Sequence, residues 1–170
     1  EKAGFTCSLP AYLSMRASGQ NLMTGPNFAS TGLGYYDPTA IEFVMIPLSQ
    51  QLEYSKEYKS KLAVVTGNSQ SHSIISRALY IISVGSNDFG PNYYANSLLF
   101  KALPVDQFLD PMVNIVSDTV TQFHGMGSRR IDVFSLPPLG CFPLVIMVFG
   151  HGRSGVSLGS ISALRYIKKS

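Results

Sequence analysis

Tryptophan, charged side chains and long apolar runs are scarce or absent in this sequence. It contains no Trp in 170 residues, and 14% of its residues are charged while 45% are hydrophobic. This balance excludes a disordered chain and favours one globular domain with a core. No apolar run approaches the roughly 20 residues that span a bilayer, so we expect no stable membrane insertion. The net charge of +3 is too small and scattered to predict nucleic-acid binding.

Cysteine is also scarce, since Cys7 and Cys141 are the only two in the chain. Two cysteines cannot define a disulfide framework, and neither has the spacing of a metal site. Whether they pair stays open, because the sequence gives no geometry for a bond between them. A glycine-rich phosphate loop between a strand and a helix is missing as well, which argues against a nucleotide-binding domain. We therefore expect no metal and no other cofactor.

Local patterns predict the first and last parts of the secondary structure. Residues 22–29 are predicted to form a short strand, and Pro26 confines that strand to a sheet edge because it lacks an N–H donor. Asp106 is predicted to cap a long amphipathic helix, and Pro111 to limit or kink its first turns. Gly125 and Gly127 are expected to end this helix.

Helical spacing dominates the middle of the chain. Residues 48–62 predict an amphipathic helix that ends near Gly67, with Glu57 and Lys61 one turn apart on its exposed face. A short helical turn at residues 73–77 then leads toward a strand.

Two β-rich runs predict that sheet. Residues 79–84 read as a buried strand and residues 131–135 as a second strand, and the long helical crossover between them implies a parallel pair in an α/β fold. A loop rich in Asn and Tyr is expected after the first strand. Between that strand and the loop stands the tetrapeptide Gly-Ser-Asn-Asp of residues 85–88. It places Asn87 at the carboxyl edge of the sheet, where a carboxamide can stabilise an oxyanion without carrying charge.

Three segments in this order carry a family resemblance. They are residues 25–34 (GPNFASTGLG), 85–88 (GSND) and 135–141 (SLPPLGC). Together they resemble the plant GDSL esterase/lipase family of the SGNH hydrolases. Residues 47–54 are also similar to a helix of that family, so the resemblance covers about residues 11–152. Each motif is modest, but their order and spacing are specific.

The resemblance implies a flavodoxin-like, three-layer α/β/α sandwich that hydrolyses carboxylic esters. In the family, a backbone N–H of a glycine in the second block and the Asn side chain of the third block help to form the oxyanion hole. Carried over, the donors are Asn87 and Gly34, with Gly32 as the close competitor. Thr31 and Leu33 depart from the small residues usual beside this glycine.

The family's other catalytic groups have no counterpart in this sequence. No Gly-Asp-Ser nucleophile motif occurs, and no Asp is followed three positions later by His. We therefore expect no nucleophile, acid or base within the chain. The chain has three histidines, His72, His124 and His151. We expect His72 and His124 to take surface or helix-terminal roles, and His151 to lie in a loop without a catalytic role.

These absences predict an incomplete domain. The resemblance implies that the first strand, which leads into the nucleophile, and the C-terminal catalytic segment are missing. Residues 1–170 are thus expected to form a single partial domain, with an atypical tail at residues 153–170. Glu1 opens the chain without an initiator Met or a signal-peptide pattern, as a cut N-terminus would.

Two functions remain open from the sequence. The first is a fragment of a GDSL-type serine ester hydrolase for lipid or other acyl esters, which retains oxyanion donors but is inactive by itself. The second is a truncated paralogue that binds an acyl ligand or acts as a decoy. An acyl ester is the expected small-molecule partner, and the oligomeric state is not predicted. The resemblance implies secretion for full-length relatives, although this chain has no signal peptide and no Asn-x-Ser/Thr sequon.

Overall fold

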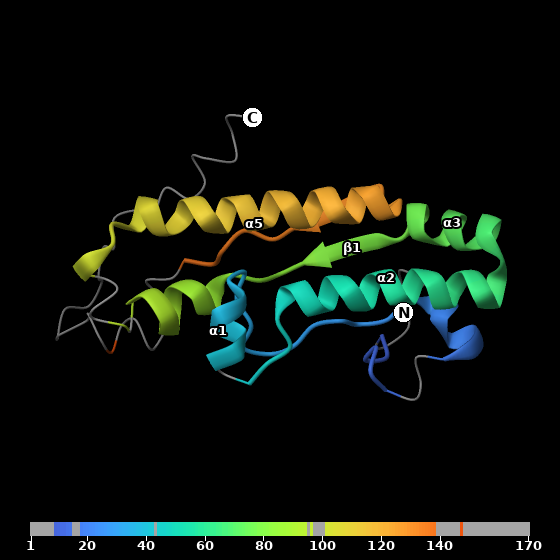
Figure 1. The fold of residues 1–170 in the computed structure, drawn as a ribbon, viewed down its shortest axis with the longest axis horizontal. Helices are drawn as coiled ribbons and strands as arrows, with labels where there is room; N and C mark the ends of the chain where they lie inside the picture. The colour runs from blue at the N-terminus through green and yellow to red at the C-terminus, as the bar shows by residue number, and fades with distance from the viewer. Residues whose placement is uncertain are drawn as a thin grey trace.

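The fold combines helices with a short parallel sheet (Figure 1). The computed structural model describes residues 9–14, 18–42, 44–94, 96, 101–138 and 147. In chain order the elements are the 3-10 helix η1 (Gly19–Thr24), α1 (Asp37–Glu42), α2 (Leu48–Thr66), α3 (Asn68–Arg77), β1 (Leu79–Ile82), the π-helix η2 (Asp88–Tyr94), α5 (Val105–Met126) and β2 (Arg130–Val133).

The sheet has two parallel strands in the order β1-β2 among the described residues. Leu79 pairs with Arg130 and Ile82 with Val133, and the Phe134 N–H extends the ladder by donating to the Ile82 carbonyl at 2.9 Å. The prediction of a parallel α/β pair is confirmed, because α5 forms the crossover between the strands. Both strands end slightly earlier than the sequence predicted.

Helices cover one face of this sheet. The side chains of Tyr80 and Ile82 point to the covered face. There the ring centroids of Tyr80 and of Phe123 in α5 lie 5.2 Å apart. Leu52 of α2 belongs to the same core cluster, and Figure 1 shows α5 and α2 running along β1. Ile81, on the other face, is 59% exposed, so the prediction that residues 79–84 form a buried strand is wrong for this face. The described residues thus supply two layers of the predicted three-layer sandwich, as expected of an incomplete α/β fold.

A hairpin of α2 and α3 forms the second packing unit. Helix α2 matches the predicted helix and ends at Gly67, and its Lys61 and Glu57 form an ion pair at 2.7 Å. The predicted turn at residues 73–77 is a longer helix, α3, which begins at Asn68 directly after Gly67. In Figure 1 this hairpin delivers the chain to the start of β1.

The edge strand predicted at residues 22–29 is wrong. The chain there forms η1, in which the Gly25 N–H donates to the Leu22 carbonyl at 3.3 Å, and only Asn27 makes a single parallel bridge, to Ala11. The Tyr58 hydroxyl donates to the same Leu22 carbonyl at 2.7 Å in a buried contact. The carbonyl that a strand partner would need is therefore used by α2.

The capping role predicted for Asp106 is also wrong. Pro104 precedes the first residue of α5 as its cap, and Asp106 lies within the first turn, where its charge favours the positive end of the helix dipole. The helix continues through Pro111 and past Gly125, and it ends at Gly127, which adopts the left-handed conformation. Pro111 therefore does not limit the helix.

The loop predicted after β1 is also wrong, because this stretch forms the π-helix η2. Its aromatic side chains hold it to α5, since the Tyr93 and Phe108 rings stack with centroids 4.7 Å apart and the Phe89 and Phe108 rings meet edge to face at 5.3 Å. Pro91 falls in the first turn of η2, where a backbone N–H has no helical partner. Burial of Phe89 and Tyr93 thus outweighs the turn-forming preference of the neighbouring Asn and Gly.

Candidate functional site

Three loops meet beyond the carboxyl ends of the strands, and Gly85 lies where they touch. Gly85 has a φ of +110°, and a Cβ there would lie 2.8 Å from Tyr35 Cε2 and 2.9 Å from Leu136 Cδ2. Only glycine fits both this conformation and this spacing. The Gly85 turn therefore packs against the loop around Tyr35 on one side and the loop after β2 on the other. Residues 139–141 of the third segment lie outside the described residues.

Asn87 faces the glycine loop. Its Nδ2 donates a hydrogen bond of 3.0 Å to the carbonyl of Leu33, 54 residues earlier in the chain, and its side chain is partly buried. A carboxamide nitrogen carries two hydrogens, so one remains for another acceptor. The structure thus brings together the two segments that the sequence singled out as oxyanion donors.

The two candidate glycines differ in what surrounds them. Gly34 is buried, and a Cβ added to it would overlap the carboxylate of Asp88. Gly32 is a turn glycine with a φ of +84°, and its nearest neighbour for a Cβ is the flexible side chain of Met45 at 3.5 Å. Among the described residues, the N–H of Gly34 donates no hydrogen bond. Gly34 therefore keeps a free donor, which points away from the Leu33 carbonyl that Asn87 binds because the peptide unit they share is trans.

Asp88 is a residue that the sequence analysis missed. It is completely buried, and its carboxylate accepts hydrogen bonds from the Tyr35 N–H at 2.6 Å, the Tyr36 N–H at 3.3 Å and the Thr39 hydroxyl at 3.0 Å. Burial raises the pKa of Asp88 above its ordinary value, and the three donors only partly offset this effect. Burial, helped by the nearby Asp88 charge, raises the pKa of Tyr35 to about 12.

No local sequence pattern predicts this role of Asp88, because its hydrogen-bond partners lie some 50 residues away in the chain. The one available signal is its place between the apolar run of β1 and the aromatic residues Phe89 and Tyr93, which are buried. An acid enclosed in that way must find donors, since an unpaired buried charge is very costly.

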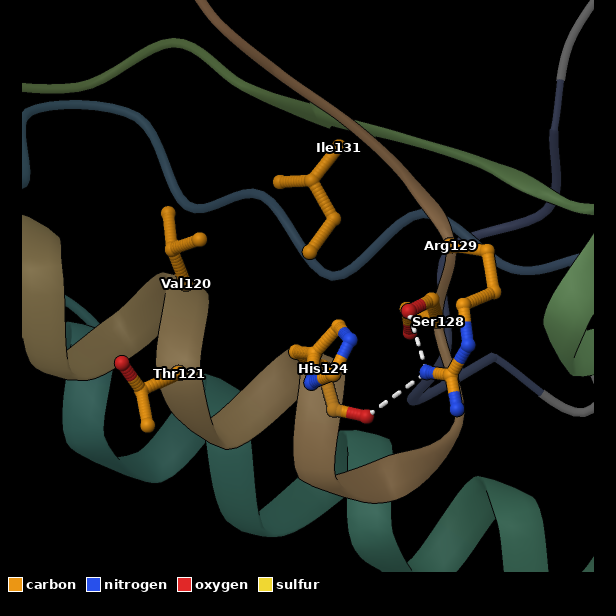
Figure 2. A pocket seen from close by; sticks show the side chains of 6 residues that line it. All are labelled: Val120, Thr121, His124, Ser128, Arg129 and Ile131. Atoms are coloured by element: carbon orange, nitrogen blue, oxygen red, sulfur yellow. Dashed lines mark hydrogen bonds between the residues drawn. The ribbon is translucent and has the colours of Figure 1, made fainter.

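The described histidines lie away from this site, as expected. His72 is exposed in α3, and His124 is exposed in the last turn of α5. His124 lines a hollow of about 370 Å³ near the start of β2, where Arg129 donates hydrogen bonds to the carbonyls of His124 and Ser128 (Figure 2). These bonds satisfy carbonyls at a helix end, which is a structural role. His151 lies outside the described residues.

The part of the chain that the structure describes holds no group of three or more His, Cys, Asp or Glu side chains able to bind a metal. Nor does any helix within it combine the length and apolar character that crossing a membrane requires.

The fold and the site define an α/β protein whose loops meet at the carboxyl edge of a parallel sheet, the place where this class binds its ligands. The family model described as GDSL-like lipase/acylhydrolase matches residues 2–167. The chain therefore belongs to the GDSL lipase/acylhydrolase family, whose substrates are small-molecule esters. The match begins before and ends after residues 11–152, for which the sequence predicts the resemblance.

Relatives from Arabidopsis thaliana agree with this assignment. The GDSL esterase/lipase APG is 45% identical over 170 residues, which cover 99% of this chain and 48% of that protein. The GDSL esterase/lipase At5g22810 is 44% identical over 160 residues, covering 92% of this chain and 44% of the relative. The chain thus spans less than half the length of these relatives. No solved structure matches it significantly.

Proposed function

We propose that this chain is part of a GDSL-type carboxylic ester hydrolase and supplies the auxiliary half of its oxyanion hole. Asn87 would donate through Nδ2 and Gly34 through its backbone N–H to the oxygen that becomes negative when an ester carbonyl is attacked. The observation that carries this proposal is the 3.0 Å hydrogen bond from Asn87 to the Leu33 carbonyl, because it ties Asn87 to the peptide unit that includes the Gly34 N–H. We prefer Gly34 to Gly32 because Asn87 binds the peptide unit that contains the Gly34 N–H.

The same proposal makes the 170-residue chain inactive by itself. The sequence contains no Gly-Asp-Ser motif and no Asp followed three positions later by His. Oxyanion donors without a nucleophile and base support only residual catalysis. Secretion remains part of the proposal and rests on the family resemblance alone.

A serine-reactive fluorophosphonate tests the missing nucleophile. We expect no labelling of the purified 170-residue chain and no hydrolysis of p-nitrophenyl butyrate, with the longer relative APG as the positive control. Stoichiometric labelling of this chain would contradict the proposal, because it would identify an activated serine within the sequence.

The oxyanion donors can be tested without turnover, because a fatty carboxylate offers the same kind of acceptor oxygen. We expect octanoate to shift the NMR signals of the Asn87 side-chain amide and the Gly34 N–H. In Asn87→Ala we expect the shift of the Gly34 N–H signal to be lost. Asn114→Ala, on the exposed surface of α5, is the matched control. Shifts that leave Asn87 and Gly34 unaffected would count against this site.

An acyl-binding or decoy protein is the second candidate. It is favoured by a hollow of about 310 Å³ beside Tyr35, whose apolar lining includes Leu48, Leu52 and Ile115. This candidate would be favoured by saturable octanoate binding that Leu52→Gln weakens. It would also require that the protein encoded by the longest natural transcript hydrolyses no ester. Hydrolysis by that longer product would favour the enzyme.

A further inference from the structure

Two adjacent residues of one turn hold two residues that flank Gly34. Asn87 binds the Leu33 carbonyl at 3.0 Å, and Asp88 accepts the Tyr35 N–H at 2.6 Å. Gly34 stands between Leu33 and Tyr35, so both peptide units around it are tied to the same turn. A short stretch of backbone that is fixed on both sides has little freedom to move.

The Asp88 carboxylate also fills the space beside Gly34. A Cβ on Gly34 would overlap that carboxylate, which shows that the backbone of the loop lies directly against it. Charge-assisted hydrogen bonds to a carboxylate are stronger than neutral ones, and here they are shielded from water because Asp88 is 0% exposed. The described residues place no cation against it, so backbone and hydroxyl donors alone stabilise the buried acid.

Thr39 completes the arrangement from α1. Its Oγ1 accepts a hydrogen bond of 2.9 Å from Asn92 Nδ2 and donates to Asp88 at 3.0 Å. Because a hydroxyl has one hydrogen, the bond from Asn92 leaves that hydrogen free to point at the carboxylate. In Figure 1, α1 lies beside the segment that follows β1, in agreement with these bonds.

We propose that Asp88 is a positioning residue that fixes the N–H of Gly34 relative to the carboxamide of Asn87. The inference rests on the proposed oxyanion role of Asn87 and Gly34, and it assigns to Asp88 no contact with the substrate. Two donors act together on one oxyanion only if their spacing is set before the charge develops. Asp88 sets this spacing by tying the loop of residues 33–36 to the turn that carries Asn87.

Hydrogen exchange of the full 170-residue chain tests the clamp directly. In the unaltered chain we expect the Tyr35 and Tyr36 amides to be protected. Asp88→Asn replaces two acceptor oxygens by one, so their exchange should accelerate about tenfold or more while that of α5 changes little. Asp110→Asn, exposed on α5, is the control that should change neither region. Unprotected amides in the unaltered chain, or unchanged exchange in Asp88→Asn, would overturn the inference.

A second variant covers the case in which Asp88→Asn unfolds the chain. Thr39→Val removes one donor and keeps the carboxylate, and we expect it to accelerate exchange in residues 33–40 by a smaller factor. Exchange in that segment equal to that of the unaltered chain would then overturn the inference.

Octanoate separates a positioning role from a merely structural one. In the folded Thr39→Val or Asp88→Asn protein, we expect octanoate still to shift the Asn87 side-chain amide, but to lose most of its effect on the Gly34 N–H. Equal responses at both donors would overturn the positioning role. If octanoate shifts neither donor in the unaltered chain, the proposed oxyanion function fails, and the exchange data alone then decide whether Asp88 holds the loop.

Discussion

At the scale of single residues, the backbone of a glycine lies directly against a buried acid in the site. A glycine suits a backbone donor at position 34, because its amide can approach a substrate without a Cβ in the way. The structure gives a second reason, since the side of Gly34 on which a Cβ would stand is occupied by the Asp88 carboxylate. The motif could be recognised from sequence because its spacing is local. The partnership with Asp88 could not, because it depends on how distant loops pack.

Substitutions at Gly34 and Asp88 should therefore be coupled. Gly34→Ala forces a methyl group into the carboxylate, and overpacking of this kind costs about 1–3 kcal/mol of unfolding free energy. In an Asp88→Ala background the space is free, so we expect the same change to cost less than about 0.5 kcal/mol. Urea unfolding measures both values.

Gly125→Ala is the control for this cycle, because nothing lies within 4 Å of a Cβ there and the site is helical. It should stabilise the chain by about 0.5–1 kcal/mol. An equal cost of Gly34→Ala in both backgrounds would show that the carboxylate is not the obstacle.

At the scale of elements, periodic patterns predicted well and isolated signals predicted poorly. The strand at residues 79–84 and helix α2 follow from apolar spacing over several residues, and both are present. The predicted strand at residues 22–29 failed because Tyr58, which belongs to another element, takes the Leu22 carbonyl. The π-helix η2 was missed because aromatic burial decides its form. Tertiary contacts of this kind leave no periodic trace in the sequence.

Pro111 offers a test at this scale, since α5 passes through it without ending. A proline there withholds the hydrogen bond that an N–H at this position would donate to the Gln107 carbonyl. Pro111→Ala should therefore raise the stability of the chain by about 1–3 kcal/mol, seen as a higher melting temperature by circular dichroism. Pro104→Ala should give no such gain, because the cap position has no intrahelical acceptor for its N–H. A melting temperature unchanged by Pro111→Ala would contradict this account.

At the scale of the whole molecule, the helices protect the sheet on one side. Ile82 is 6% exposed beneath α2 and α5, whereas its neighbour Ile81 is 59% exposed on the opposite face. The parallel order of the strands and the convergence of three loops at one edge could be predicted from the order of the motifs. The coverage of a single face could not, because it depends on which helices pack where.

These two neighbouring isoleucines form a matched pair. Ile82→Ala removes buried methyl groups and should lower the unfolding free energy by about 2–5 kcal/mol. Ile81→Ala should cost less than about 1 kcal/mol, the range of strand preferences alone. Urea titrations of both variants measure the difference, and equal losses would show that the second face is also covered.

The contact between Gly34 and Asp88 also constrains how the sequence can change over generations. A bulkier residue at position 34 is tolerated only after the acid at position 88 has been replaced by a smaller residue. Substitutions at the two positions are therefore coupled. Loss of the acid alone would leave the approach of a substrate as the remaining reason for a glycine at position 34. Covariation between these two positions would therefore record the history of this buried contact.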